Sequence, residues 1–397
     1  MASQPQAAAL KGSVKLGSYL RKLRTGYGYS LRRVEERARA EGGEIDNSQL
    51  SRYEKGVCYP SFDKLRILAN VFNVSIQSFS DVVDLESFEA LKPDTNDAAE
   101  LQERGLDALK AGDTGLSFAL FERAIELLSD GPQDSETQEQ LGRARINQAA
   151  VLNRLGKLAL AEQELRSALR LSERLSPVLQ ARALLALALI HTDQGDHFLS
   201  EMEADRAYQI AANASLPLEA AKALNLFGHV LHQRGAPTEA IERFREAGKL
   251  FARCGNDFEA NRVRINTGTC YVALGKYREG IRLLREALNE ARNAGHRRLE
   301  AHAWSNLGEA YYRQDDLRRA RGCFLESDAL AHHNGEKQPD ILFFNAFYEW
   351  KMAIQTENPT REKIAFGRLK ALRSSLERRT VEVDAFDDYV ERGKPHA

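Results

Sequence analysis

Three stretches of this chain repeat one another at a spacing of 40 residues. They read NLFGHVLHQRGAPTEAIERFREA (225–247), INTGTCYVALGKYREGIRLLREA (265–287) and SNLGEAYYRQDDLRRARGCFLES (305–327). Gly228, Gly268 and Gly308 occupy the same place in each stretch. A constant period of this length indicates stacked helical units, because neighbouring units bury the apolar face that one unit cannot bury alone.

Each repeat combines a small residue with a large one 16 positions later, as Gly308 with Phe324. The small residue lets two helices approach closely, and the large residue fills the space behind. The same phase extends backward, where Ala149 precedes Leu165, although Ala204 stands at a position that calls for a large residue. We therefore expect six units over about residues 98–330 and a degenerate seventh pair at 340–375 that caps the last apolar face.

The charge is divided unevenly along the chain. Residues 11–80 hold 13 Lys and Arg against 7 Asp and Glu, whereas the rest holds 43 against 50. A basic segment of this kind favours contact with a polyanion. The four cysteines show no CxxC spacing and indicate reduced thiols. No apolar run approaches membrane-spanning length, and the start MASQPQAAALKGS does not resemble a signal peptide.

Motifs of catalytic sites are missing from the sequence. It contains no Walker loop and no GxSxG, HExxH or GxGxxG motif. The histidine pairs lack neighbouring Cys or carboxylate ligands at metal-binding spacing. We therefore expect a protein that is not an enzyme and that holds no cofactor and no metal.

The residues Trp304, Leu307, Gly308, Tyr311, Ala320 and Phe324 carry a recognisable pattern. In this pattern the chain resembles the tetratricopeptide repeat (TPR) family over about residues 98–330, with a longer period than usual. The resemblance implies an all-α, right-handed superhelix of about six to seven helical pairs. It also implies that the first helix of each pair lines a concave wall that binds a peptide.

The family places its inner-wall positions six, three and two residues before the small residue, and one residue after it. An asparagine amide both donates and accepts hydrogen bonds and suits a peptide backbone, and basic side chains suit carboxylates. The alternative is that single positions only face solvent or bridge to the next repeat. The peptide-binding candidates are Arg143, Asn147, Arg182, Lys222, Asn225, His229, Arg262, Asn266, His302, Asn306, Glu309 and Asn345.

The basic segment predicts five short helices over residues 16–82, of which the third lies in NSQLSRYEKGVCYPS at 47–61. Asp46 can cap this third helix, with Gln49 as the reciprocal partner of a capping box. On a helical wheel Leu50, Tyr53 and Glu54 share one face, and Ser48, Arg52 and Lys55 share another, with Asn47 and Ser51 beside them. Such a helix fits the major groove of DNA, where Arg52 suits guanine and Asn47 suits adenine.

The segments Ser30-Leu31, Leu50 to Gly56 and Pro60-Ser61 carry a second resemblance, to the Xre/Cro-type helix-turn-helix domain. It implies that Glu54 pairs with Arg24, and that bases or phosphates are contacted by Ser30, Arg32, Asn47, Ser48, Ser51, Arg52 and Lys55. Two departures are the long connection AEGGEID and Glu35, where a small residue is expected. The alternative is that such a domain serves only protein interaction.

We expect four parts. They are a DNA-binding domain at 14–84, a linker at 85–97, a TPR solenoid for ligand binding and dimerisation at 98–378, and a C-terminal helix and tail at 379–397. The combination resembles the RRNPP family of peptide-responsive quorum-sensing regulators.

This resemblance implies a cytoplasmic homodimer that regulates transcription from a palindromic operator in double-stranded DNA. A short signalling peptide in the groove would change the arrangement of the two DNA-binding domains. Two alternatives stay open. In one, the groove holds a partner protein in a scaffold or anti-regulator; in the other, the solenoid modulates a signalling enzyme.

Overall fold

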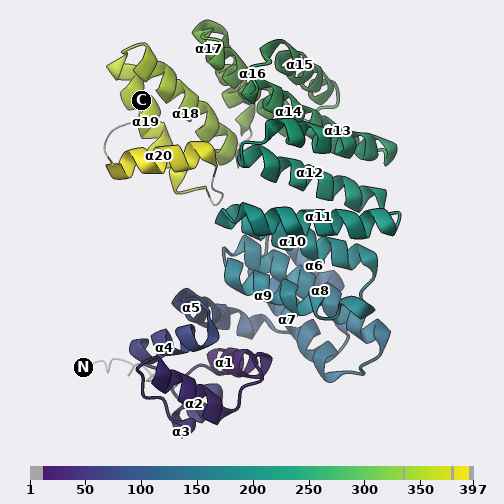
Figure 1. The fold of residues 1–397 in the computed structure, drawn as a ribbon, viewed down its shortest axis with the longest axis vertical. Coiled ribbons are helices and arrows are strands. Elements are labelled where there is room, and N and C mark those ends of the chain that lie inside the picture. The colour runs from purple at the N-terminus through teal and green to yellow at the C-terminus, as the bar shows by residue number, and fades with distance from the viewer. Residues whose placement is uncertain (1–11, 334–335, 377–379, 393–397) are drawn as a thin grey trace, which may run out of the picture. The chain divides into compact units, whose positions relative to one another are not determined.

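The computed structural model describes residues 12–333, 336–376 and 380–392 (Figure 1). Residues Met1–Ala168 and Leu169–Ala397 form two compact units, which we call unit 1 and unit 2 and describe separately. Within the described ranges the regular secondary structure is helical apart from one antiparallel pair of short strands, β1 (His332–His333) and β2 (Glu336–Lys337). The expected all-α fold is confirmed. Residue 379 and residues 393–397 of the expected C-terminal part lie outside the described ranges.

Unit 1 begins with the five expected helices, α1 (Val14–Gly26), α2 (Leu31–Ala40), α3 (Asn47–Glu54), α4 (Phe62–Phe72) and α5 (Ile76–Asp84). We call these five helices the head. The Asp46 side chain accepts from the backbone N–H of Gln49 at 2.8 Å, so the predicted cap of α3 is present. The reciprocal half of the capping box is absent, because Gln49 Oε1 accepts from Lys64 Nζ at 2.8 Å instead.

The expected linker begins as a 3₁₀ helix, η1 (Leu85–Leu91), which packs against α7 (Thr114–Asp130). The ring of Phe88 lies 5.8 Å from that of Phe118, measured between centroids. Leu85 is buried. This part of the chain therefore attaches the head to the first repeat through apolar contacts, and it is not an extended spacer.

The repeats of unit 1 are two antiparallel pairs. The first pair is α6 (Ala98–Lys110) with α7, and the second is α8 (Ser135–Arg154) with α9 (Leu158–Leu169). We call the first helix of every pair the A helix and the second the B helix.

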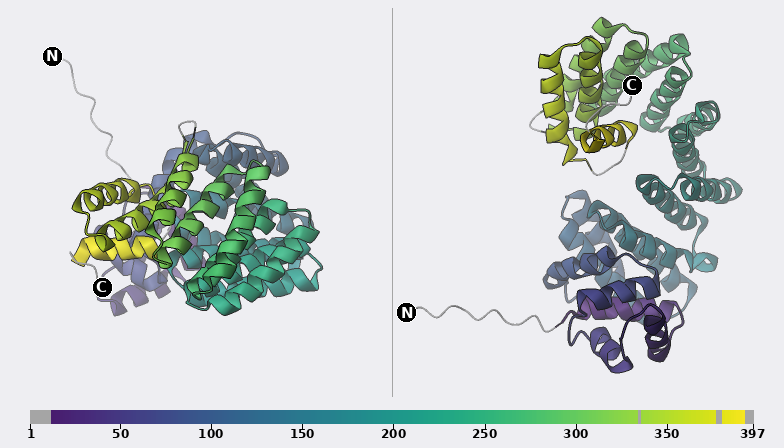
Figure 2. Two further views of the ribbon diagram at one scale, coloured as in Figure 1. Left: turned by 90° about the horizontal axis from the view of Figure 1, so that it is seen from above. Right: turned by 60° about the vertical axis from the view of Figure 1, so that its left-hand side comes forward.

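Unit 2 continues the pairs in chain order, as Figures 1 and 2 show. A short 3₁₀ helix, η2 (Ser172–Arg174), precedes them, and α20 (Val381–Arg392) follows them. The paired helices are α10 (Pro177–Gln194), α11 (His197–Asn213), α12 (Pro217–Gln233), α13 (Pro237–Arg253), α14 (Asp257–Ala273), α15 (Tyr277–Asn293), α16 (Arg297–Arg313), α17 (Leu317–Ala331), α18 (Pro339–Gln355) and α19 (Pro359–Arg373).

The small and large residues of the repeat meet as predicted. A Cβ atom added to Gly308 would lie 2.5 Å from Cε1 of Phe324, and one added to Gly228 would lie 2.8 Å from Cδ1 of Phe244. Both phenylalanines are buried. The glycine therefore sets how closely the A and B helices of a pair approach, and it recurs with the 40-residue period of the pairs.

An aromatic cluster closes the end of unit 2. Phe386 and Tyr389 of α20 pack on Trp350 of α18, with ring centroids 6.3 and 4.8 Å away. Phe366 of α19 joins them, 5.5 Å from Phe386. The seventh pair and α20 thus cover the apolar face that the sixth pair leaves, in agreement with the predicted cap.

Candidate nucleic-acid interface and repeat-domain surface

The orientation of α3 is fixed from its inner side. Leu50 and Tyr53 are buried against the rest of the head. The guanidinium of Arg24 donates to both carboxylate oxygens of Glu54, at 2.6 and 2.9 Å, and also to the carbonyl of Tyr29 at 3.0 Å. The hydrogen bond to Glu54 raises the pKa of Arg24. This bidentate ion pair confirms the Arg24–Glu54 contact that the helix-turn-helix resemblance implied, and it links α3 to α1.

The outer face of α3 carries the predicted contact residues. Asn47, Ser48, Arg52 and Lys55 are exposed, and Ser51 is half-buried. Within the described ranges, neither Arg52 nor Lys55 has an ion-pair partner. Long cations held on a rigid helix without an internal counter-ion are available to an external anion or a guanine edge.

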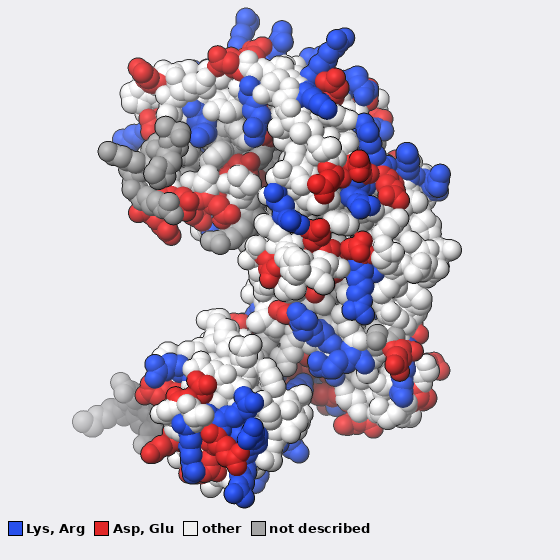
Figure 3. All heavy atoms as spheres, in the orientation of Figure 1, with Lys and Arg blue, Asp and Glu red and all other residues white. Residues whose placement is uncertain are grey.

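The remaining predicted contacts lie at the start of α2. The Ser30 hydroxyl accepts from the backbone N–H of Arg33 at 3.1 Å and caps the helix. Arg32 is exposed and lies 3.7 Å from Glu36. Both residues face solvent, where they are accessible to a phosphate. Figure 3 shows the cations of the head interspersed with Asp and Glu, so the positive charge of this segment is not one uniform patch.

The two departures from the helix-turn-helix pattern are accommodated locally. Glu35 turns along its own helix and pairs with Arg39 at 2.6 Å. The long connection enters α3 through Gly42, at φ 77°, and Gly43. A Cβ on Gly43 would lie 2.1 Å from Cδ1 of Ile67, so a larger residue there would require the Ile67 side chain of α4 to shift.

Successive A helices of unit 2 lie against one another, α10 with α12, α12 with α14, α14 with α16 and α16 with α18. No such contact of comparable extent joins the described B helices of unit 2. A stack of pairs that is tighter on one side curves toward that side. The A helices therefore form the inner surface of unit 2, which is where the TPR resemblance placed the candidate ligand contacts.

The cations of this inner surface have partners that the sequence reading missed. Arg182 lies 3.5 Å from Glu219, and Lys222 lies 4.0 Å from the same carboxylate. Arg262 pairs with Glu259 at 2.6 Å. Glu219 and Glu259 both stand nine positions before the small residue of their repeat, a spacing that could have revealed them. The surface is therefore of mixed charge.

Polar side chains link adjacent repeats along the same surface. The amide of Asn266 donates to that of Asn225 at 3.3 Å, and both residues are half-buried. The hydroxyl of Thr269 donates to Asn306 Oδ1 at 2.9 Å. Asn225 and Asn266 are thus half-buried residues that share a long hydrogen bond, which a peptide backbone can replace.

Three residues predicted to contact a ligand are buried and form hydrogen bonds within the protein instead. Asn345 is fully buried, and its amide bonds to Ser305, Ser327 and Asp328 at 2.6 to 2.9 Å. Asn306 is also buried and donates to the carbonyl of His302 at 2.7 Å. These asparagines satisfy groups between and within helices and do not face a groove.

Glu309 is the third of these contacts. It is buried and accepts from Arg313 at 2.7 Å. Burial, together with the charge of Glu309, raises the pKa of Glu382 in α20, which packs on α18, the A helix of the seventh pair. Burial lowers the pKa of His302 to about 4, so this histidine is neutral near pH 7 and is no cationic contact.

The other candidates are on the surface. His229 is exposed on α12. In unit 1, Arg143 is exposed on α8 and Asn147 is half-buried. The candidate inner-surface contacts that remain accessible in unit 2 are Arg182, Lys222, Asn225, His229, Arg262 and Asn266.

Family profiles match three parts of the chain. A helix-turn-helix profile matches residues 20–79, and tetratricopeptide-repeat profiles match residues 142–167 and 259–330. The chain joins a helix-turn-helix domain to tetratricopeptide repeats. Among curated proteins, none is significantly similar to it in sequence.

Solved structures share this fold at low sequence identity. RapI in its apo form is 10% identical over 70% of this chain and 97% of its own, with a TM-score of 0.58. A Rap protein in complex with Competence and Sporulation Factor is 14% identical over 75% and 80%, with a TM-score of 0.54. The apo quorum sensor NprR from B. thuringiensis is 14% identical over 75% and 82%, with a TM-score of 0.51.

Neither a metal-ligand cluster nor a membrane-spanning helix occurs in the described ranges. No three His, Cys, Asp or Glu side chains of these residues gather as metal ligands would. No helix of the same residues has the length and apolarity that crossing a bilayer requires.

Proposed function

We propose that this protein is a sequence-specific DNA-binding regulator of transcription, whose repeat domain senses a short peptide on the inner surface of the A helices. The observation that carries the proposal is the setting of α3. Its inner side is locked by the Arg24–Glu54 pair, while Asn47, Arg52 and Lys55 face outward. A rigid helix that presents an amide and two cations has the groups that read base edges in the major groove.

The repeat domain supports the sensing half of the proposal. Asn225 and Asn266 offer amide groups on adjacent A helices, and Arg182, Lys222 and Arg262 alternate with Glu219 and Glu259 around them. This pattern suits an extended peptide, whose backbone meets the amides and whose charged groups meet the pairs. A Rap protein of the same fold has been solved with Competence and Sporulation Factor, and NprR is described as a quorum sensor. In our proposal the chain acts as a cytoplasmic homodimer on a palindromic operator.

The DNA-binding half is tested with duplexes enriched from a random-sequence pool by the wild-type protein. We expect Arg52→Ala to lose about tenfold or more in affinity and to lose preference at one base pair, since a bidentate contact to guanine contributes about 1–3 kcal/mol. Arg66→Ala is the matched control, because it removes one exposed cation from α4 of the same head. It should keep the base preference. Failure to enrich any duplex, or an unchanged preference with Arg52→Ala, would contradict the proposal.

The sensing half is tested by affinity selection from random octapeptides, read by mass spectrometry. We expect wild type to retain a defined set of peptides and the double variant Asn225→Ala/Asn266→Ala to lose it. The control double variant, Asn213→Ala/Asn293→Ala, removes two exposed amides from B helices and should behave as wild type. Equal retention by both double variants would place any peptide site elsewhere.

A further inference from the structure

A cavity of about 700 Å³ lies within unit 1, between the head and the first two helical pairs. Residues of α1, α5 and η1 line one side, and residues of α7, α8 and α9 line the other. Small-molecule sites commonly have volumes of roughly 300–1,000 Å³, so this space is large enough for a ligand. The peptide surface proposed above involves different residues.

The lining of the cavity is largely apolar. Tyr19 of α1 contributes an aromatic wall, and burial raises the pKa of its hydroxyl to about 12, so it stays protonated. The aliphatic and aromatic side chains facing it are Val82, Leu85, Phe118, Ile125, Leu152 and Leu160. Such walls favour an apolar ligand body, because covering them removes apolar surface from water.

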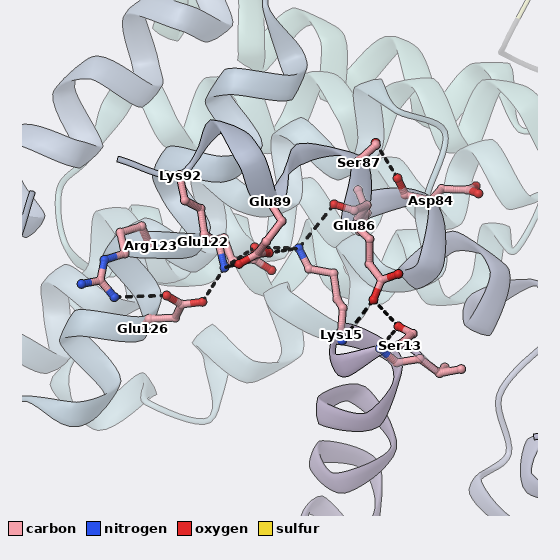
Figure 4. Close-up of polar contacts among 12 residues, drawn as sticks. Ser13, Lys15, Asp84, Glu86, Ser87, Glu89, Lys92, Glu122, Arg123 and Glu126 are labelled. Atoms are coloured by element: carbon pink, nitrogen blue, oxygen red, sulfur yellow. Dashed lines mark hydrogen bonds and ion pairs between the residues drawn. The ribbon is translucent and has the colours of Figure 1, made fainter. Parts of the chain in front are cut away.

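Along one edge of the cavity Lys15, Lys92 and Arg123 pair with Glu89, Glu122 and Glu126, and Arg123 lies 3.4 Å from Glu126 (Figure 4). Lys15 Nζ lies 2.7 Å from Glu122 and 3.2 Å from Glu89. Lys92 Nζ lies 2.8 Å from Glu89, 2.9 Å from Glu122 and 2.7 Å from Glu126. An added ionic group would have to displace one of these pairs, so this edge favours an uncharged ligand.

Gln148 is a lining side chain of the cavity with an unsatisfied buried oxygen. The residue is 4% exposed and lines the cavity, and its Oε1 has no hydrogen-bond donor among the described residues. The equivalent position of a later repeat, one residue before the small residue, is Thr267, whose hydroxyl is satisfied by the carbonyl of Val263 at 2.8 Å. A buried carbonyl without a donor is costly, so Gln148 indicates a donor brought by an occupant.

We propose that this cavity is a second ligand site, which binds an uncharged small molecule with an apolar body and one hydrogen-bond donor directed at Gln148 Oε1. An amide N–H or a hydroxyl group supplies such a donor. The proposal does not rest on peptide sensing or on DNA binding, since it concerns the cavity alone.

A single helix, α1, lies between the cavity and α3 and contacts both. The helix α1 lines the cavity with Lys15 and Tyr19, and it also contacts α3. A Cβ on Gly17 would lie 2.5 Å from the carbonyl oxygen of Tyr53, so the backbones of α1 and α3 touch there. Arg24 of α1 holds Glu54 of α3. An occupant that shifts α1 therefore acts on the helix that positions α3.

The test uses two probes with one ring system, 2-naphthol, which donates a hydrogen bond, and 2-methoxynaphthalene, which does not. Binding to the full chain at pH 7 is measured by titration calorimetry. We expect 2-naphthol to bind saturably at one site per chain, and about fivefold or more tighter than 2-methoxynaphthalene. Gln148→Leu should remove this difference. Thr267→Val, the matched control at the equivalent repeat position, should preserve it.

Substitutions that fill the cavity provide the second part of the binding test. Leu160→Trp should abolish binding of both probes, and Leu152→Phe serves if circular dichroism shows that the tryptophan variant is misfolded. Three results would each overturn the proposal. These are no saturable binding of 2-naphthol to wild type, equal affinity of wild type for the two probes, and binding that survives in a folded cavity-filled variant. None of them bears on the DNA or peptide tests, so the two proposals fail independently.

Discussion

Alanine at Gly308 tests whether the glycine–phenylalanine contact sets the spacing of each helical pair. The new Cβ would lie 2.5 Å from Cε1 and 2.7 Å from Cδ1 of Phe324, well inside van der Waals contact. Phe324 is fully buried, and its ring stacks on Tyr348 with centroids 5.9 Å apart, so it cannot turn aside without moving a neighbour. Overpacking costs about 1–3 kcal/mol, and alanine in place of a helical glycine returns about 0.5–1 kcal/mol. We expect Gly308→Ala to lower the free energy of unfolding by about 1–2 kcal/mol.

The assay is urea unfolding followed by tryptophan fluorescence. The chain has two tryptophans, Trp304 and Trp350, and both lie in unit 2 with Gly308. The signal therefore reports the unit that carries the substitution. Gly322→Ala is the matched control, because Gly322 is an exposed glycine of α17 whose added Cβ meets no described atom within 4 Å. It should raise stability by about 0.5–1 kcal/mol.

A second substitution can relieve the clash. Phe324→Leu combined with Gly308→Ala reproduces the pair Ala149 and Leu165, which the second repeat uses with both residues buried. We expect the double variant to be about 1 kcal/mol more stable than the sum of the two single effects predicts. Additive effects, or a stability change of the same sign for Gly308→Ala and Gly322→Ala, would refute the reasoning.

Three further predictions follow from the contacts described above. Glu54→Gln should speed hydrogen exchange of the α3 amides, since it leaves a mostly buried guanidinium poorly paired, whereas Glu35→Gln, at an ion pair within α2, should change it little. Because burial lowers the pKa of His302 to about 4, the unfolded chain binds more protons than the folded one as pH falls from about 6.5 toward 4. Wild type should therefore lose stability over that range relative to His302→Phe, measured by fluorescence-detected unfolding at each pH; parallel curves would refute it. Lys92→Met should expose residues 85–97 to faster limited proteolysis, because it removes one ammonium from among three glutamates and leaves Lys15 alone to pair with Glu89 and Glu122, while Lys110→Met, at an exposed pair, should not.

The sequence alone predicted the elements because their determinants are local or periodic. Asp46 and Ser30 cap the helices that follow them, and the recurrence of Gly308 and Phe324 at fixed spacing predicts which helices pair. The contact of Arg24 with Glu54 was available from the resemblance to helix-turn-helix domains. These features depend on residues within one helix, one turn or one repeat unit, so a single sequence contains them.

The tertiary structure decided which polar side chains remain available. Asn266 and Asn345 both occupy inner positions of a repeat, yet Asn266 is half-buried beside Asn225 whereas Asn345 is enclosed by Ser305, Ser327 and Asp328. The same holds for Gln148, whose missing donor becomes visible only when the head and the first repeats enclose it. Burial and hydrogen-bond satisfaction depend on groups far apart in the chain, and repeat spacing carries no information about those distances.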